Sequence, residues 1–213
     1  EVQQSPDGIA QALILGEDFL NSSPSALILG DNIFYGPGLR EKLAEANLKK
    51  NGATIFAYAV KDPERYGVVK VDKKGKPVKI SEKPKKPKSN LAVTGLYFYD
   101  NEAVNQVKQL KPSKRGELEI TDLNKLYMNQ GNLNLQTFSR GFAWLDTGTP
   151  ESLHDASTFI RLIEERQNFK ISCLEEIAFK NGWITRDSIE KKFKNRTDSY
   201  SKYLMRVIKN GNN

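Results

Sequence analysis

The chain has 213 residues, enough to bury one sizeable core but short for two independent domains. It is 38% hydrophobic and 28% charged, and no apolar run approaches a membrane span, so the composition argues against a transmembrane or strongly disordered protein. The net charge of +7 suits small polyanions such as nucleotides, but the basic residues are scattered and no nucleic-acid-binding motif accompanies them.

The N-terminal part alternates helical and strand-like patterns. The expected elements are a helix over 9–20, a buried strand over 26–30, an amphipathic helix over 39–50 and a strand over 54–60. Strand, helix and strand in this order predict a parallel sheet with right-handed crossovers.

From residue 66 the pattern changes. Segments 66–71 and 76–81 flank a polar turn and predict a β-hairpin, which is followed by an apolar and aromatic strand over 91–99. We interpret residues 62–100 as a mixed insertion over the ligand edge of the sheet.

The remaining elements divide the chain near residue 150. They are helices over 101–110 and 120–129, a strand over 133–138, and after Pro150 helices over 151–167, 175–180, 186–193 and 200–208. The fold class is therefore α/β, a Rossmann-like mixed sheet in residues 1–150 with a helical C-terminal extension in 151–213.

Two aspartates stand where apolar runs end in glycine turns. Asp31 follows Leu-Ile-Leu-Gly, and Asp146 follows Trp144 and Leu145 and precedes Thr-Gly. Ligands of open α/β sheets bind beyond the carboxyl ends of the strands, so the pair suggests a shared Mg²⁺ site for phosphate chemistry. The alternative for each aspartate is a turn-forming or helix-capping acid.

Seven short motifs occur in one order along the chain. They are VQQSPDGIAQA (2–12), LGDNIFYG (29–36), DPERYGVV (62–69), SEKP (81–84), AVTGLYFYD (92–100), RGELEITD (115–122) and WLDTGT (144–149). In these the chain resembles the bacterial glucose-1-phosphate thymidylyltransferase family of sugar nucleotidyltransferases, which implies the glycosyltransferase-A-like form of the fold. The resemblance also implies Mg²⁺-dependent transfer from dTTP to glucose 1-phosphate, giving dTDP-glucose for dTDP-rhamnose synthesis.

The resemblance carries roles for individual residues. The implied catalytic residues are Asp31, Lys83 and Asp146, with the two aspartates as metal ligands; the nucleotide site is Gln3, Gly8 and Asp31; the sugar-phosphate site is Tyr66, Gly67, Glu82, Lys83, Val93 and Thr121. Trp144 is as well explained as a core anchor as by a ligand contact.

Glu82 and Lys83 can share one site only if the strand bends, because adjacent strand residues face opposite ways. Pro84 restricts Lys83 to extended conformations and marks a strand end, which favours such a distortion. The alternative is a surface ion pair in a lysine-rich loop, and the run 83–88 is itself interpreted as solvated.

One departure from the family is clear: its glycine-rich phosphate loop and the lysine that follows it are not in this sequence. We therefore expect a fragment of the enzyme, inactive by itself and with an exposed sheet edge or apolar surface. The resemblance further implies a homotetramer with a regulatory nucleotide site. The matching positions are Tyr35, Gly36, Arg40, Glu41, Lys170 and Lys180, which an ordinary interface or solvated helix face explains equally well.

Two other functions stay open: a uridylyl- or cytidylyltransferase acting on a sugar 1-phosphate, and a non-catalytic protein that binds nucleotide sugars as a regulator. The only histidine, His154, is expected at the surface or an interface, so no catalytic set built on histidine is predicted. A single cysteine, Cys173, excludes an intramolecular disulfide, and with no leader in view a cytoplasmic setting is expected.

Overall fold

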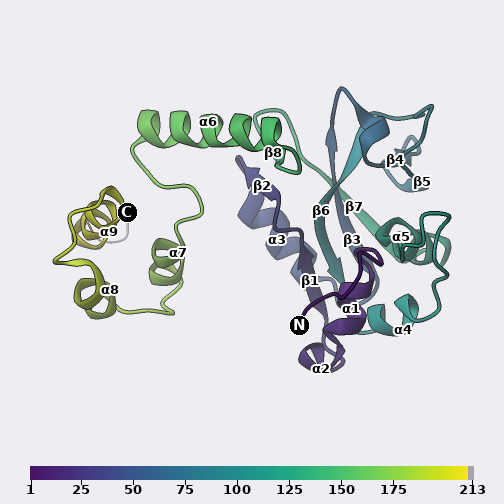
Figure 1. Cartoon of the computed structure of the whole chain (residues 1–213), viewed down its shortest axis with the longest axis horizontal. Coiled ribbons are helices and arrows are strands. Elements are labelled where there is room, and N and C mark those ends of the chain that lie inside the picture. Colours follow the sequence, from purple (N-terminus) through teal and green to yellow (C-terminus); the bar gives the residue numbers. More distant parts are fainter. Residues whose placement is uncertain (211–213) are drawn as a thin grey trace. The chain divides into compact units, whose positions relative to one another are not determined.

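The computed structural model describes residues 1–210, and the chain divides into two compact units, Glu1–Asp146 and Thr147–Asn213. The first is a mixed α/β unit and the second is helical (Figure 1). Among the described residues, no helix has the length and apolar character needed to cross a membrane.

The main sheet of the first unit has six strands in the order β5-β4-β6-β3-β7, with β1 pairing to β6. The strands are β1 (Ser25–Ile28), β3 (Ala53–Ala59), β4 (Gly67–Val71), β5 (Pro77–Glu82), β6 (Leu91–Tyr99) and β7 (Leu133–Thr137). The prediction of a mixed sheet is confirmed, and so are the hairpin of β4 and β5 and the long strand β6.

The expectation that the first two predicted strands lie in a parallel sheet is wrong. Both β1 and β3 pair with β6 in the antiparallel sense, at its two edges, and β3 is parallel only to β7. The nine-residue strand β6 is long enough to accept β1 along its second half and β3 along its whole length. A strand from the insertion thus separates the two strands that sequence order would have made neighbours.

Helices cover both faces of this sheet (Figure 1). On one face lie α1 (Gln11–Leu15), α4 (Ala103–Val107) and α5 (Ile120–Asn129), whose side chains Leu13, Val107 and Leu123 join one apolar cluster with Ile55 and Val69. On the other face α3 (Leu39–Leu48) contributes Ala46 to a cluster of phenylalanines.

The predicted helix over 9–20 is not continuous. It is divided at Gly16 into α1 and α2 (Glu17–Leu20), because Gly16 departs from helical geometry, and it ends at Asn21 in the left-handed conformation. Phe19 of α2 is 91% exposed, and Ile28 of β1 is 58% exposed. Within the described residues β1 pairs with β6 alone, so its other edge carries no strand.

The strand that ends at Asp146 was expected, but its partner strand β2 (Asn32–Tyr35), the sheet that the two form and one short turn were not. This second sheet of two strands joins β2 to β8 (Ala143–Asp146), and a short 3₁₀ turn, η1, covers Pro63–Arg65. The β2–β8 ribbon matters most, because it places the two predicted aspartate motifs side by side: Asn32, next to Asp31, stands opposite Asp146.

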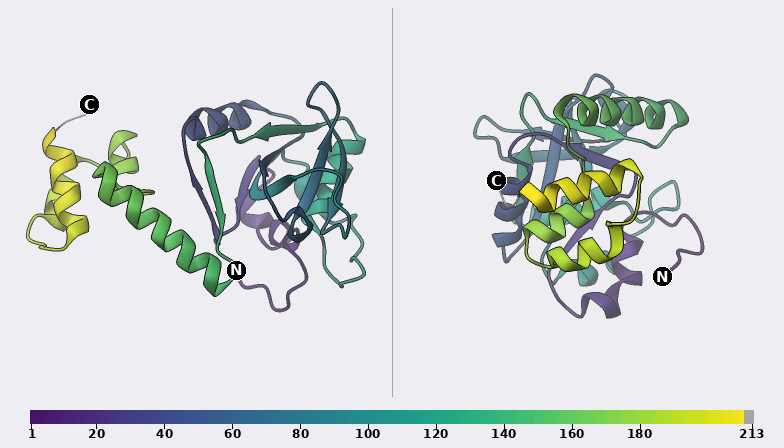
Figure 2. Two further views of the ribbon diagram at one scale, coloured as in Figure 1. Left: turned by 90° about the horizontal axis from the view of Figure 1, so that it is seen from above. Right: turned by 90° about the vertical axis from the view of Figure 1, so that its left-hand side faces the viewer.

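The second unit contains α6 (Pro150–Gln167), α7 (Leu174–Lys180), α8 (Arg186–Phe193) and α9 (Ser199–Asn210). The first begins with a capping box in which Thr149 and Ser152 bond reciprocally. The last three gather into a small bundle around Ile189 and Leu204 (Figure 2). Cys173 is buried there and its thiol donates to the Tyr200 hydroxyl at 3.3 Å, whereas His154 is exposed on α6.

Candidate functional site

A cavity of about 360 Å³ lies where β1, β5 and the β2–β8 ribbon end. Eight of the predicted site residues line it: Asp31, Tyr66, Gly67, Glu82, Lys83, Val93, Thr121 and Asp146. They come from segments spread over more than a hundred residues, so the fold alone brings them together. Trp144 lines the cavity as well while only 8% exposed, so its burial agrees with a core anchor, and a ligand contact stays a prediction.

Asn32 holds the aspartate side of the cavity in place. Its side-chain oxygen accepts hydrogen bonds from Trp144 Nε1 at 2.6 Å and from the Gly95 backbone at 3.0 Å, and its amide donates to Asp31 Oδ1 at 2.7 Å. Glycine is required at 95, because a Cβ there would lie 2.7 Å from Asn32 Oδ1 and 2.8 Å from Leu29 Cδ1. Sequence reasoning missed Asn32, although it stands beside Asp31 in the LGDN motif.

Asp146, on the facing strand, lies near a cation. Arg65 Nη2 is 3.8 Å from Asp146 Oδ2, and the same guanidinium pairs with Asp62 at 2.8 Å. The Tyr66 ring packs on Trp144 with a centroid distance of 5.1 Å, and burial raises the pKa of the Tyr66 hydroxyl. Tyr66 is therefore a neutral wall of the cavity rather than a proton acceptor at neutral pH.

The strand end at Glu82 and Lys83 bends as the shared site requires. Lys83 has φ +37°, a left-handed value rare outside glycine, and its backbone N–H donates to the Tyr66 carbonyl at 3.0 Å. The expectation of an extended Lys83 is thus wrong: this hydrogen bond holds the backbone in the strained turn despite Pro84. Consequently Glu82 and Lys83 both line the cavity, and Glu82 Oε2 accepts from Thr121 Oγ1 at 2.5 Å.

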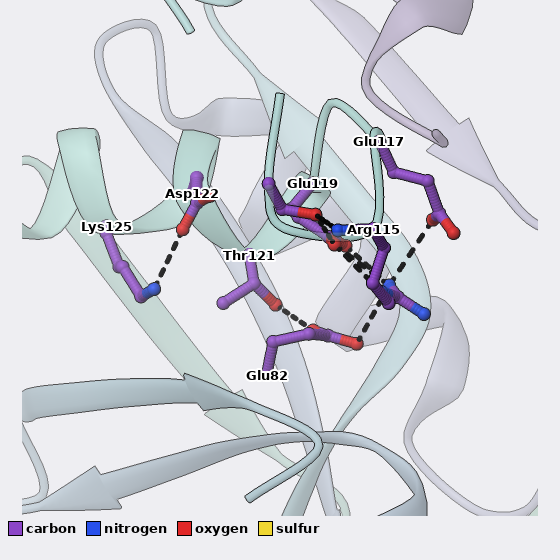
Figure 3. A network of polar contacts seen from close by, with 8 residues as sticks. Glu82, Arg115, Glu117, Glu119, Thr121, Asp122 and Lys125 are labelled. Carbon is purple, nitrogen blue, oxygen red and sulfur yellow. Dashed lines mark hydrogen bonds and ion pairs between the residues drawn. The ribbon is translucent and has the colours of Figure 1, made fainter. Parts of the chain in front are cut away.

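Arg115 is a charged side chain of the cavity that was not among the predicted site residues (Figure 3). Its guanidinium bonds to both oxygens of Glu119 at 2.8 to 3.1 Å and lies 3.3 Å from Glu117 and 3.9 Å from Glu82. Burial acts to raise the pKa of Glu119, but the bonds from Arg115 and Ser113 outweigh it and leave that pKa below its usual range. The bond to Glu119 likewise raises the pKa of Arg115, which stays charged at the cavity wall.

The two predicted base-recognition residues do not line this cavity. Gln3 Nε2 donates to the Gly8 carbonyl at 3.1 Å and to Gln11 Oε1 at 2.6 Å. Gly8 has φ +102°, and a Cβ there would lie 2.4 Å from the carbonyl oxygen of Leu118. Both residues shape the loop that brings Ile9 to the cavity rim, and their predicted contact with the nucleotide base stays a prediction.

The predicted regulatory positions fall in both units. Tyr35 ends β2 and Gly36 follows it, Arg40 and Glu41 lie in the first turn of α3, and the two lysines belong to the helical unit. There Lys170 pairs with Glu164 at 2.5 Å and Lys180 with Glu176 at 2.8 Å. A regulatory role for these residues stays a prediction.

The donor set at the ribbon end fits one hard cation. Mg²⁺ takes oxygen ligands and typically one or two protein carboxylates, keeping several waters. Asp31 and Asp146 offer two carboxylates at one cavity, and no group of three or more histidine, cysteine, aspartate or glutamate side chains suited to a metal occurs in residues 1–210. Two carboxylates beside open space fit Mg²⁺ better than a closed four-ligand zinc site, and the magnesium site stays a prediction.

Comparison with known proteins adds independent information. Residues 1–162 match the nucleotidyl transferase family. Two curated relatives named glucose-1-phosphate thymidylyltransferase, from Neisseria gonorrhoeae and Xanthomonas campestris, are 54% and 53% identical over 208 and 214 residues; the matches cover 97% and 99% of this chain and 72% of each relative.

Solved structures agree with these relatives. A structure described as a glucose-1-phosphate thymidylyltransferase from Bacillus anthracis, in complex with sucrose, is 45% identical with a TM-score of 0.67, and the match covers 75% of this chain and 63% of that one. A UDP-glucose pyrophosphorylase complexed with UDP-glucose is 24% identical with a TM-score of 0.62 over 74% of this chain and 63% of its own, and supports the fold alone.

Proposed function

This chain belongs to the nucleotidyl transferase family and, within it, to the glucose-1-phosphate thymidylyltransferases, and from that premise we propose its reaction. The phosphate of glucose 1-phosphate attacks the α-phosphorus of dTTP, and dTDP-glucose and pyrophosphate are released. Both reactants are anions, so the protein acts by positioning them and by neutralising charge. The relatives are longer than this chain, and the whole activity is therefore a proposal for it.

Support for the sugar-phosphate half comes from one wall of the cavity. Lys83 supplies a point charge and Arg115 a planar guanidinium, the two kinds of cation that proteins use to bind phosphate. Glu82 can accept hydrogen bonds from sugar hydroxyls. Gly67, opposite Glu82 in the hairpin, keeps this wall open, because a Cβ there would lie 3.1 Å from Thr121 Oγ1.

The opposite wall suits the nucleotide phosphates. Asp31 and Asp146 would hold Mg²⁺, which would neutralise charge on the nucleotide phosphates and on the departing pyrophosphate. Asn32 fixes the orientation of Asp31, and Arg65 places a positive charge beside Asp146. These residues hold the reactants, and no side chain of the chain needs to form a covalent intermediate.

One observation carries the proposal: Lys83 leaves the strand in a strained conformation and enters the cavity that both aspartates line. Calorimetric titration of glucose 1-phosphate tests it. Loss of the Lys83 contact, a charge-assisted hydrogen bond, should weaken binding to Lys83→Ala by about tenfold or more. Lys85→Ala, which removes an equal charge two residues away from outside the cavity, should leave binding unchanged. Equal binding to all three forms would contradict the proposal.

Pyrophosphate release from glucose 1-phosphate with dTTP, UTP or CTP tests the reaction and its nucleotide, with the Neisseria gonorrhoeae enzyme as positive control. Preference for UTP or CTP would favour the alternative transferases. Binding without turnover would agree with the prediction that this chain alone is inactive, or with a regulatory protein. Assembly into a homo-oligomer is also a proposal, tested by light scattering.

A further inference from the structure

The hairpin of β4 and β5 has two chemically different faces. Side chains alternate along each strand, so the cross-strand pairs Gly67 with Glu82 and Val69 with Ile80 face the cavity and the core. The intervening pairs, Val68 with Ser81 and Lys70 with Lys79, face the other way. The function proposed above uses only the first face.

The second face contains a hollow of about 130 Å³ lined mainly by lysines. Its lining is Val68, Lys70, Lys79, Ser81, Pro84, Lys86, Lys88 and Ser89. Four lysine side chains thus line one depression whose lining includes no acidic residue. The last two lysines belong to the basic run 83–88, whose lysines are all exposed, as the interpretation of a solvated loop expects. Lys86 and Lys88 of this loop lie beside the outer face of the hairpin.

Repulsion between these lysines destabilises the hairpin. Lys70 and Lys79 stand directly opposite each other in the antiparallel ladder, where like charges destabilise a hairpin. In the described part of the chain, no ion pair joins any of the four lysines to an acidic side chain. An anion in the hollow would relieve this repulsion, so its binding should stabilise the fold.

The residues that line the hollow also indicate which kind of anion it can bind. The hollow is small and no aromatic ring lines it, which is unlike a surface on which nucleic-acid bases stack. The hydroxyls of Ser81 and Ser89 can donate to phosphate oxygens, and the lysine ammonium groups can donate to several oxygens at once. We propose that this lysine hollow is a second anion site, for a small phosphate-type polyanion such as a diphosphate, distinct from the cavity on the other face.

The two sites share one strand end. Ser81 and Pro84 line the lysine hollow, while Glu82 and Lys83, which lie between them in sequence, line the cavity. An anion bound in the hollow would therefore contact the segment whose strained turn carries Lys83. By linkage, any change that it causes in sugar-phosphate affinity is matched by the reverse effect of the sugar phosphate.

Titration of inorganic pyrophosphate tests the site without relying on the proposed reaction. The background is Lys83→Ala, which weakens anion binding in the cavity. On it, Lys70→Gln/Lys79→Gln should weaken pyrophosphate binding by about tenfold or more. Lys73→Gln/Lys74→Gln removes the same charge from the turn of the same hairpin, outside the hollow, and should change affinity less than about threefold.

Thermal unfolding provides a second measurement. Without pyrophosphate, Lys70→Gln/Lys79→Gln should melt at the same or a higher temperature because it removes a repulsive pair, and it should gain less from added pyrophosphate than the parent. If both double variants lost the same pyrophosphate affinity, the loss would follow from the lower net charge of the protein and not from a site in the hollow, and the proposal would be overturned. A single-stranded oligonucleotide that binds the hollow more tightly than pyrophosphate would also overturn it.

Discussion

Replacing Asn32 by alanine should damage both the fold and the metal side of the cavity. The substitution removes the acceptor of two donors, Trp144 Nε1 and the Gly95 backbone N–H, in a part of the protein where Trp144 is 8% exposed. A buried donor left without an acceptor costs roughly 1 to 3 kcal/mol, so the loss of two acceptor contacts should lower the free energy of unfolding by about 2 to 6 kcal/mol. A domain in the upper part of the usual range of about 5 to 15 kcal/mol stays folded after this loss.

Asp31→Asn separates the two effects. It keeps both bonds to the Asn32 oxygen and alters only an exposed side chain, so stability should change by less than about 0.5 kcal/mol. Both variants should lose Mg²⁺ affinity, because one lacks the carboxylate and the other lacks the amide that orients it.

Urea unfolding followed by tryptophan fluorescence measures the stability change. Trp183 is 74% exposed, so a Trp183→Phe background leaves Trp144 as the reporter inside the first unit. A stability loss below about 1 kcal/mol in Asn32→Ala would mean that the two donors find other acceptors, and would refute the argument that Asn32 organises this wall.

Three further substitutions test the neighbouring contacts. Because the pKa of Glu119 is lowered in the folded protein, its ionised form contributes stability at pH values above its ordinary pKa of 4.5, and this stability is lost as the pH falls through the lowered pKa. Glu119→Gln removes the ion pair with Arg115, so the free energy of unfolding should depend less on pH in that acid range. Thr121→Val removes the donor to Glu82 and should weaken glucose 1-phosphate binding by about tenfold, measured by calorimetry. Gly8→Ala meets both a backbone clash and a left-handed φ, so its melting temperature should fall by several degrees, roughly the effect of 1 to 3 kcal/mol.

Local sequence patterns predicted most helices and strands, because the spacing of apolar residues in a segment shows which of its residues are buried. The strand over 91–99 and the helix over 120–129 have the predicted bounds. Strand direction was predicted wrongly, because periodicity shows which residues are buried but not which strand lies beside them. The insertion supplied β6, and its antiparallel pairing with both β1 and β3 could not be read from either strand alone.

The candidate site was predictable only where a residue type was distinctive for its place. An aspartate after an apolar strand is such a signal, and both aspartates line the cavity. Arg115 gave no such signal, because an arginine followed by two glutamates is also the pattern of a solvated turn. Its position became visible only when Glu82, Glu117 and Glu119 were found around one guanidinium.

The cavity and the lysine hollow differ in net charge, and that difference predicts how anion binding at each site responds to metal removal. The cavity is lined by five carboxylates and three cations, which give it a net charge of −2, whereas the lining of the lysine hollow has a net charge of +4. The charged residues of the cavity are Asp31, Glu82, Glu117, Glu119, Asp146, Arg65, Lys83 and Arg115. A polyanion should therefore enter the cavity only with a divalent cation, but should enter the hollow without one.

Pyrophosphate titrations with Mg²⁺ or with EDTA test this contrast. In Lys70→Gln/Lys79→Gln, where the hollow keeps only Lys86 and Lys88 and the cavity is intact, EDTA should weaken the remaining pyrophosphate binding strongly. In Lys83→Ala, where the hollow is intact, EDTA should leave binding unchanged or tighter, because free pyrophosphate carries more negative charge than its magnesium complex. Metal dependence of both sites would contradict the assignment of the hollow as a direct anion site, and metal independence of both would contradict the role of Asp31 and Asp146.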